Sequence, residues 1–322
     1  MNMKKVAPIN ILIACDKNYA PYYGVLLSSL FRHNPKQAFR IYLVTDGTWS
    51  KSQEQKFRQL CKRHCSEFHV IIVDADIVKN CPVVPNYHVN VSAYYHILSP
   101  LILPQEIDKI IYMDGDMIVC DDICDLWSLD MEGYAMAAAL DSVAFWDETY
   151  ERLGYKAKYG YINNGVSIIN LKYWREHHIY EKAVAFMNAH SDSLRLMDQD
   201  TENGVLREKM KILPITYNFQ IMFLAEYFWN RFDDDFKTNV LETAKHPIVI
   251  HYNGGTKPWS WRYWKLPYRR EWLREYWHSP WWFAYQIQPI GKYIKHLIKR
   301  IVRRRKTIAA QQSQYIPESH GL

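Results

Sequence analysis

The stretch KIIYMDGDMIVCDD, residues 109–122, joins a short apolar run to two aspartates that flank one glycine. In an extended segment, residues i and i+2 point the same way, so Asp114 and Asp116 can converge on one point. Two carboxylates held close together repel unless one is protonated or a cation lies between them, and hard ions such as Mn²⁺ and Mg²⁺ prefer such oxygen ligands. A plain hairpin stays open as an alternative, because Asp-Gly between alternating strands is also a strong turn signal.

Around this stretch, apolar runs of strand length alternate with helix-like segments through the first half of the chain. The alternation predicts an α/β fold with a mostly parallel central sheet and helices on both faces. The expected strands cover residues 9–15, 39–46, 68–74 and 109–113, and the expected helices cover 22–33, 50–65 and about 92–102.

The second half is more mixed. We expect strands at 161–170 and 246–252, and helices from 171 to about 190 and over 198–209. From Trp259 onward the composition shifts to Trp, Tyr, Arg and Lys. The sequence therefore predicts one main domain over residues 1–258 and a C-terminal appendage over residues 259–322.

Four aspartates close predicted strands: Asp16, Asp46, Asp74 and Asp114. Ligands bind at the carboxyl ends of parallel strands, although any one Asp can simply start a turn. The first strand is not followed by a G-x-G-x-x-G fingerprint, and the chain has no Walker loop. A phosphorylated ligand would therefore need another group to neutralise its phosphates.

The segment HYNGGTKPW, residues 251–259, offers such groups at the end of another predicted strand. His251 could be a third metal ligand, Gly254 and Gly255 would let the backbone approach a phosphate, and Lys257 would add a positive charge. Taken alone, the segment could also be an ordinary loop with a capping or core histidine.

Five motifs together resemble glycosyltransferase family 8, the retaining nucleotide-sugar transferases, and most of all its branch that builds bacterial lipopolysaccharide or lipooligosaccharide. The likeness covers about residues 9–259. In the family's order, the motifs are ACDKNYA (14–20), YMDGDMIV (112–119), NNGVSIINLKYW (163–174), DQD (198–200) and HYNGGTKPW (251–259).

The resemblance implies a single GT-A domain that binds a UDP-sugar and transfers galactose or glucose, with retention, to a lipid-linked oligosaccharide acceptor. It implies that Asp114, Asp116 and His251 hold Mn²⁺ (or Mg²⁺) against the diphosphate. The other donor positions it implies are Asp16, Asn18 and Tyr19 for uracil and ribose, Gly254 and Lys257 for the diphosphate, and Asp141, Asn163, Asp198 and Gln199 around the sugar.

One position departs from the family. A basic donor-site residue, usually Arg, is expected within SAYYHILSP, and this chain has His96 there. Histidine is a weaker and pH-dependent cation, so the resemblance does not fix the identity of the sugar. Asn164 also stands where some members have a small residue.

The resemblance places Asp198, Gln199 and Asp200 at the reaction centre. The position on the β-face of the sugar matches Gln199, and an amide is a poor nucleophile. This favours front-face attack, in which the leaving phosphate helps to deprotonate the acceptor hydroxyl. Asp200 is the nearby carboxylate that could instead be the nucleophile of a double displacement.

The composition, 48% hydrophobic and 23% charged, is that of a folded chain, and no apolar run reaches the ~18 residues of a membrane-spanning helix. Residues 4–15 only partly imitate a secretory leader, because Pro8 and Asn10 interrupt the apolar part. We expect a reducing cytoplasm with free thiols. Two C-x₃-C pairs, CKRHC (61–65) and CDDIC (120–124), leave structural zinc as a rival interpretation.

The C-terminal tail is basic. Of the net charge of +6, residues 292–306 contribute eight Lys or Arg and no acid, so the rest of the chain is mildly acidic. Residues 287–301 carry an apolar stripe, and seven of the twelve tryptophans lie at 259–282. This pattern predicts a helix that lies on an anionic cytoplasmic membrane face, or a helix packed on the domain, and it speaks against nucleic-acid binding.

Two other functions stay open at this point. A transferase with a protein or soluble glycan acceptor would not need the basic tail. A non-catalytic nucleotide-sugar or glycan binder would not need the full set of polar residues described above.

Overall fold

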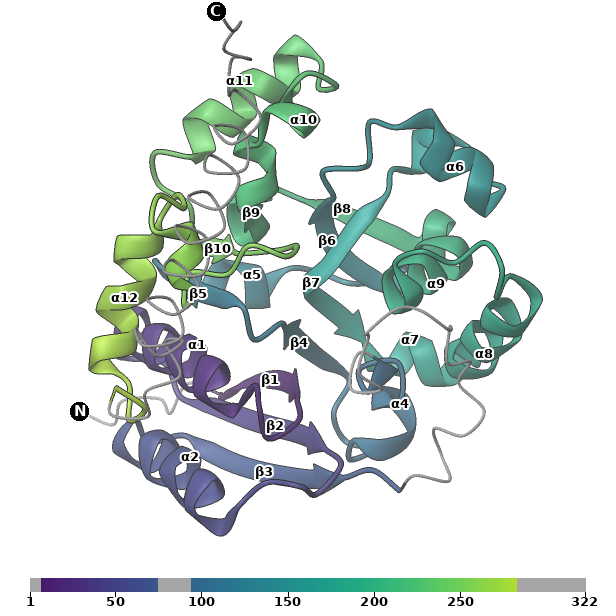
Figure 1. Cartoon of the computed structure of the whole chain (residues 1–322). Coiled ribbons are helices and arrows are strands. Elements are labelled where there is room, and N and C mark those ends of the chain that lie inside the picture. The colour runs from purple at the N-terminus through teal and green to yellow at the C-terminus, as the bar shows by residue number, and fades with distance from the viewer. Residues whose placement is uncertain (1–6, 75–93, 283–322) are drawn as a thin grey trace, which may run out of the picture.

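The computed structural model describes residues 7–74 and 94–282. Its centre is a seven-stranded sheet of order β3-β2-β1-β4-β7-β6-β8 (Figure 1). The strands are β1 (Ile9–Ala14), β2 (Phe39–Thr45), β3 (Glu67–Ile72), β4 (Lys109–Met113), β6 (Met136–Leu140), β7 (Ile162–Asn170) and β8 (Met210–Leu213). Only β7 runs antiparallel to its two neighbours, so the predicted mostly parallel α/β sheet is confirmed.

A second, three-stranded sheet has the order β5-β10-β9. It consists of β5 (Met117–Val119), β9 (Phe219–Gln220) and β10 (Val249–His251). Strand β4 pairs with β1 and β7, whereas β5 pairs with β10. The hairpin interpretation is therefore wrong: residues 114–116 carry the chain from the large sheet to the small one.

Helices cover both faces of the large sheet, as expected (Figure 1). The α-helices are α1 (Ala20–His33), α2 (Lys51–Arg63), α4 (Ser99–Ile102), α5 (Cys124–Ser128), α6 (Asp147–Leu153), α7 (Leu171–Glu176), α8 (Ile179–Ala189), α9 (Met197–Leu206), α10 (Glu226–Trp229), α11 (Asp234–Thr243) and α12 (Arg269–His278). Short 3₁₀ turns are Ala157–Tyr159, Arg207–Lys209, Ile215–Asn218, Ile221–Leu224 and Trp261–Tyr263. No helix in these parts of the chain is both long and apolar enough to cross a membrane.

Two expected helices differ from the structure. The helix expected over 92–102 falls partly outside the described residues, and in its described part, 94–102, only Ser99–Ile102 forms an α-helix. The helix expected over 171–190 is split in two, because α7 ends at Glu176 and His178 has a left-handed backbone with φ of 51°.

Strand β1 shows how the core is divided. Its alternating residues Ile11 and Ile13 belong to the apolar cluster under α1 and α2, whereas Leu12 and Ala14 belong to the cluster on the opposite face. Since successive side chains of a strand point to opposite faces, a strand buried on both sides is apolar throughout. The polar residues that follow the strands are thereby held at one edge of a rigid sheet.

The described part of the C-terminal appendage packs on α1 (Figure 1). Trp272 and Trp281 are buried, and Arg32 of α1 forms an ion pair with the buried Glu275 of α12. These two tryptophans therefore do not lie at a membrane surface, contrary to the sequence-based prediction for the cluster at 259–282. The domain boundary at 258 stays a prediction, and the predicted helix over 287–301 lies outside the described residues.

We expect Trp272→Ala to lower the free energy of unfolding by about 3–5 kcal/mol, the usual cost of truncating a buried Trp. Trp277→Ala is the matched control, because Trp277 lies on the same helix and is 58% exposed, against 1% for Trp272. Its effect should stay within about 0.5 kcal/mol. Urea unfolding of both variants measures the two changes in free energy. A change for Trp272→Ala as small as that for Trp277→Ala would show that α12 does not contribute to the core.

Candidate functional site

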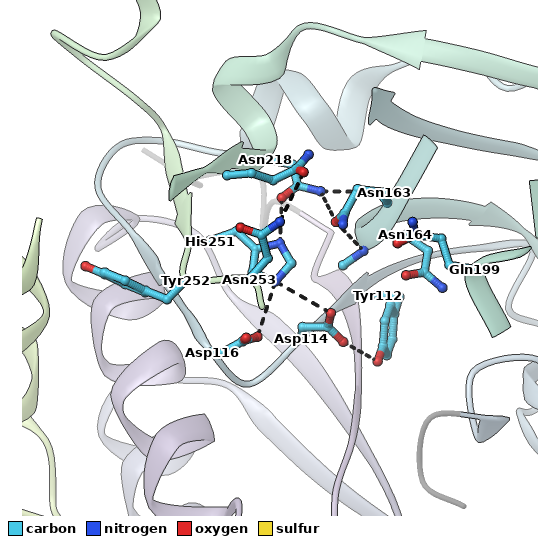
Figure 2. Close-up of polar contacts among 12 residues, drawn as sticks. Tyr112, Asp114, Asp116, Asn163, Asn164, Gln199, Asn218, His251, Tyr252 and Asn253 are labelled. Atoms are coloured by element: carbon cyan, nitrogen blue, oxygen red, sulfur yellow. Dashed lines mark hydrogen bonds and ion pairs between the residues drawn. The ribbon is translucent and has the colours of Figure 1, made fainter. Parts of the chain in front are cut away.

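Asp114, Asp116 and His251 come together where the two sheets meet (Figure 2). Asp114 follows β4, Asp116 precedes β5 and His251 ends β10. Nε2 of His251 lies 3.3 Å from Oδ1 of Asp116 and 3.9 Å from Oδ2 of Asp114. One ligand atom from each of the three residues lies within 4.8 Å of the other two, which is the arrangement predicted for a metal site.

The two carboxylates have different electrostatic surroundings. Burial and the charge of Asp116 raise the pKa of Asp114. Burial would also raise the pKa of Asp116, but the nearby charges of Lys257 and His251 hold it well below its ordinary value. The lowered pKa keeps Asp116 charged at neutral pH, and Asp114 gains most from a cation that would relieve the repulsion.

The residues around this group fit a divalent metal. Two carboxylates and an imidazole are a donor set that Mn²⁺ accepts. A Cβ on Gly165 of β7 would come within 2.5 Å of His251 Cε1 and 2.8 Å of Asp114 Oδ2, so a glycine is needed to leave room beside the ligands. Within residues 7–74 and 94–282 this is the one group of His, Cys, Asp and Glu close enough to hold a metal, so the Cys pairs at 61–65 and 120–124 do not form a zinc site there.

Asn218 orients His251, and no motif in the sequence predicts this role. Oδ1 of Asn218 lies 3.0 Å from Nδ1 of His251, and its Nδ2 donates to Oδ1 of Asn163 at 2.8 Å (Figure 2). Because the amide oxygen can only accept, Nδ1 of His251 donates to it, and this bond orients the ring with Nε2 toward the carboxylates.

We expect Asn218→Ala to weaken Mn²⁺ binding by about 10- to 100-fold, the usual effect of removing a residue that orients a metal-binding histidine. Isothermal titration of Mn²⁺ into the protein measures this. Asn239→Ala, at an exposed position of α11, is the control and should bind Mn²⁺ like the unaltered chain. Unchanged affinity in Asn218→Ala would mean that Asn218 does not orient His251 for metal binding.

The loop after β10 supplies the predicted diphosphate residues. Lys257 donates to Asp116 and, at 2.9 Å, to the carbonyl of Tyr252. Gly254 has φ of 77°, a conformation that disfavours other residues. Lys257 thus brings a positive charge to the metal-site carboxylates, where a diphosphate would need one.

Asp16, Asn18 and Tyr19 form the turn between β1 and α1. Oδ1 of Asp16 accepts from the backbone N–H groups of Asn18, at 2.8 Å, and Tyr19, at 3.1 Å. Tyr19 lies against Gly115, where an added Cβ would be 3.1 Å from its ring. Of the residues predicted to bind uracil and ribose, Tyr19 therefore lies beside the two metal-site carboxylates.

Asp141, Asn163 and Gln199 form a second group of side chains connected by hydrogen bonds. Oδ2 of Asp141 accepts from Nδ2 of Asn163 at 2.8 Å and from Nε2 of Gln199 at 3.1 Å. All three side chains are buried. Three residues from different parts of the sequence thus lie together, and their contact with a donor sugar stays a prediction.

His96 is fully buried and faces acidic groups. Its Nε2 lies 2.9 Å from Oε1 of Glu202 and 3.8 Å from Oδ2 of Asp198. Burial alone would lower the pKa of His96, but the charges of Glu202 and Asp198 outweigh it and raise the pKa to about 9. His96 is therefore a cation near neutral pH, and its direct contact with a donor stays a prediction.

Asp200 is engaged by neighbouring donors. Its carboxylate accepts two hydrogen bonds from Arg152, at 2.6 and 2.9 Å, one from the Tyr161 hydroxyl at 2.7 Å, and two from backbone N–H groups of Arg195 and Leu196. Burial would raise the pKa of Asp200, but these bonds lower it. Such a carboxylate is a weak nucleophile, because attack would give up its partners.

Comparison with known proteins agrees with the geometry. The model of one family, Glycosyl transferase family 8, matches residues 10–262. The chain is 28% identical to General stress protein A of Bacillus subtilis, over 87% of this chain and 96% of that protein. It is 26% identical to the lipopolysaccharide 1,3-galactosyltransferase of Salmonella typhimurium, over 87% of this chain and 81% of that protein.

The fold is also similar to a solved one. The crystal structure of the galactosyltransferase LgtC, with donor and acceptor sugar analogues, superposes with a TM-score of 0.75 at 24% identity. The match covers 84% of this chain and 96% of that chain. This likeness shows the fold, whereas the activity follows from the family match.

Proposed function

We propose, from the premise that this chain belongs to glycosyl transferase family 8, that it transfers galactose or glucose from a UDP-sugar to a lipopolysaccharide or lipooligosaccharide core, with retention of the α-configuration. The chain is a glycosyltransferase, with lipopolysaccharide galactosyl- and glucosyltransferases among its relatives. The observation that supports a UDP-sugar donor is the group of Asp114, Asp116 and His251 beside Lys257.

In this proposal the three ligands hold Mn²⁺ or Mg²⁺, which would supply a Lewis acid for the leaving diphosphate. Lys257 adds positive charge where negative charge develops. Gln199 donates its amide N–H to Asp141, and this bond would hold the Gln199 side chain beside the sugar. Since Asp200 is committed to Arg152 and Tyr161, we favour front-face attack without a protein nucleophile.

The test is a panel of UDP-sugars. With Mn²⁺ present, the protein should release UDP from UDP-galactose or UDP-glucose. The release should be slow without an acceptor and faster when a purified lipooligosaccharide core is added. Turnover with a soluble glycan or protein acceptor, and none with the core, would support the alternative acceptor class instead. No turnover of any UDP-sugar would reject the proposal.

We also propose that the protein acts at the cytoplasmic face of the membrane, since the basic residues 292–306 suit an anionic surface. Reversing three charges in the full chain, Arg303→Glu, Arg304→Glu and Arg305→Glu, should abolish flotation with vesicles that contain anionic lipid. A triple Lys variant at these positions is the control and should float as before. Equal flotation of the Glu and Lys variants would reject the tail as the anchor.

A further inference from the structure

Four polar side chains form a buried cluster beside the proposed donor site, and Glu202 of α9 is its centre. Nδ2 of Asn164 donates to Oδ2 of Asp198 at 2.8 Å and to Oε2 of Glu202 at 2.9 Å. An amide nitrogen has two hydrogens, so these two carboxylates use both of them. Figure 2 shows Asn164 on β7 next to Gln199, which is the residue between Asp198 and Asp200.

The other oxygen of Glu202 faces His96, 2.9 Å from its Nε2. His96 in turn stacks on Tyr112, with ring centroids 4.5 Å apart, and the Tyr112 hydroxyl donates to Asp114 at 2.6 Å. Glu202 is therefore held between a cation and an amide while it is itself only 2% exposed. A buried carboxylate of this kind fixes the groups that satisfy it.

Asp198 is the member of the cluster that reaches outward. Its side chain is 18% exposed, whereas those of Glu202 and His96 are almost fully buried. One of its oxygens is bound by Asn164. The amide orients the carboxylate, and the remaining oxygen can accept a hydrogen bond from a hydroxyl of a ligand.

We propose that Glu202 is a positioning residue for the donor sugar, which acts through Asn164 and His96 to hold the carboxylate of Asp198 toward the hexose. This inference rests on the proposed function, because it requires a hexose beside Asp198. Galactose and glucose differ at one hydroxyl, so a carboxylate held in one orientation can favour one of the two. Glu202 and Asn164 thus contribute to donor choice without touching the donor.

The test compares the KM for the UDP-sugar with the Kd for UDP alone, both with Mn²⁺. In Glu202→Ala we expect KM to rise about tenfold, with weaker discrimination between UDP-galactose and UDP-glucose, and the Kd for UDP to stay within about twofold. Glu202→Gln should recover part of the effect, since its amide oxygen still accepts from Asn164. Glu208→Ala, at an exposed position after the same helix, is the control.

If Glu202→Ala does not fold, the same measurement is made on Glu202→Gln and Asn164→Ala. We expect the KM for the UDP-sugar to be raised in both. An unchanged KM in a folded variant, or a Kd for UDP that rises as much as KM, would overturn the inference. If the unaltered protein cleaves UDP-sugars but does not use the lipooligosaccharide core, the proposed acceptor fails while this comparison still decides the role of Glu202.

Discussion

Replacing Asp116 by Asn is expected to lower Mn²⁺-dependent cleavage of the UDP-sugar by about 10³-fold, as for other removals of one preorganised electrostatic group. Asp116 is the carboxylate whose pKa is lowered by Lys257 and His251, so it is charged at neutral pH. The Asn side chain is neutral, so the substitution removes this charge and leaves Lys257 without its ion-pair partner. The rate of UDP release at saturating Mn²⁺ measures the effect.

Asp46→Asn is the matched control. Asp46 also follows a strand of the large sheet, β2, but its carboxylate accepts from the backbone and side chain of Thr48 and so serves only its own turn. This variant should keep its activity within about twofold. More than a tenth of the activity remaining in Asp116→Asn would mean that this carboxylate does not hold the metal.

The second large effect is expected on stability. Asp200→Asn should lower the free energy of unfolding by about 3–5 kcal/mol, because it leaves Arg152 in a half-buried position without its counter-charge. The pKa of Asp200 is lowered in the folded protein, so its contribution is present at neutral pH and is lost as the pH falls through the folded-state pKa. Urea unfolding at pH 7 measures the loss.

Asp192→Asn, at an exposed position before α9, is the control and should change stability by less than about 0.5 kcal/mol. The same account predicts that mass spectrometry finds no sugar attached to Asp200 in a Gln199→Glu variant incubated with UDP-sugar. A trapped adduct on Asp200 would favour double displacement over front-face attack.

The sequence predicted the strands β1 to β4 well, because each of them contains a run of mostly apolar residues. Residues 109–113 form β4 as expected. Two strands of the same sheet were missed: β6, MAAAL, and β8, MKIL, are short and poor in β-branched residues. Their strand conformation depends on pairing with β7 and with each other, which local propensity does not report.

The metal group could be predicted because its ligands lie in two short motifs, whereas the residues that orient side chains of the site lie elsewhere. Asn218 is 33 positions from His251, in a segment with no motif. Glu202 lies 38 positions from Asn164, and its neighbours in the sequence indicate only an ordinary polar residue of a helix. The hairpin signal failed for the same reason: β5 pairs with β10, about 130 residues along the chain.

The central claim is that Asp114, Asp116 and His251 hold the metal that binds the diphosphate of the donor. Calorimetric titration of UDP into the full chain, with and without Mn²⁺, tests it most directly. We expect Mn²⁺ to tighten UDP binding at least about tenfold, with one ion per chain, and His251→Ala to remove this gain. Equal affinity for UDP with and without the metal would contradict the claim.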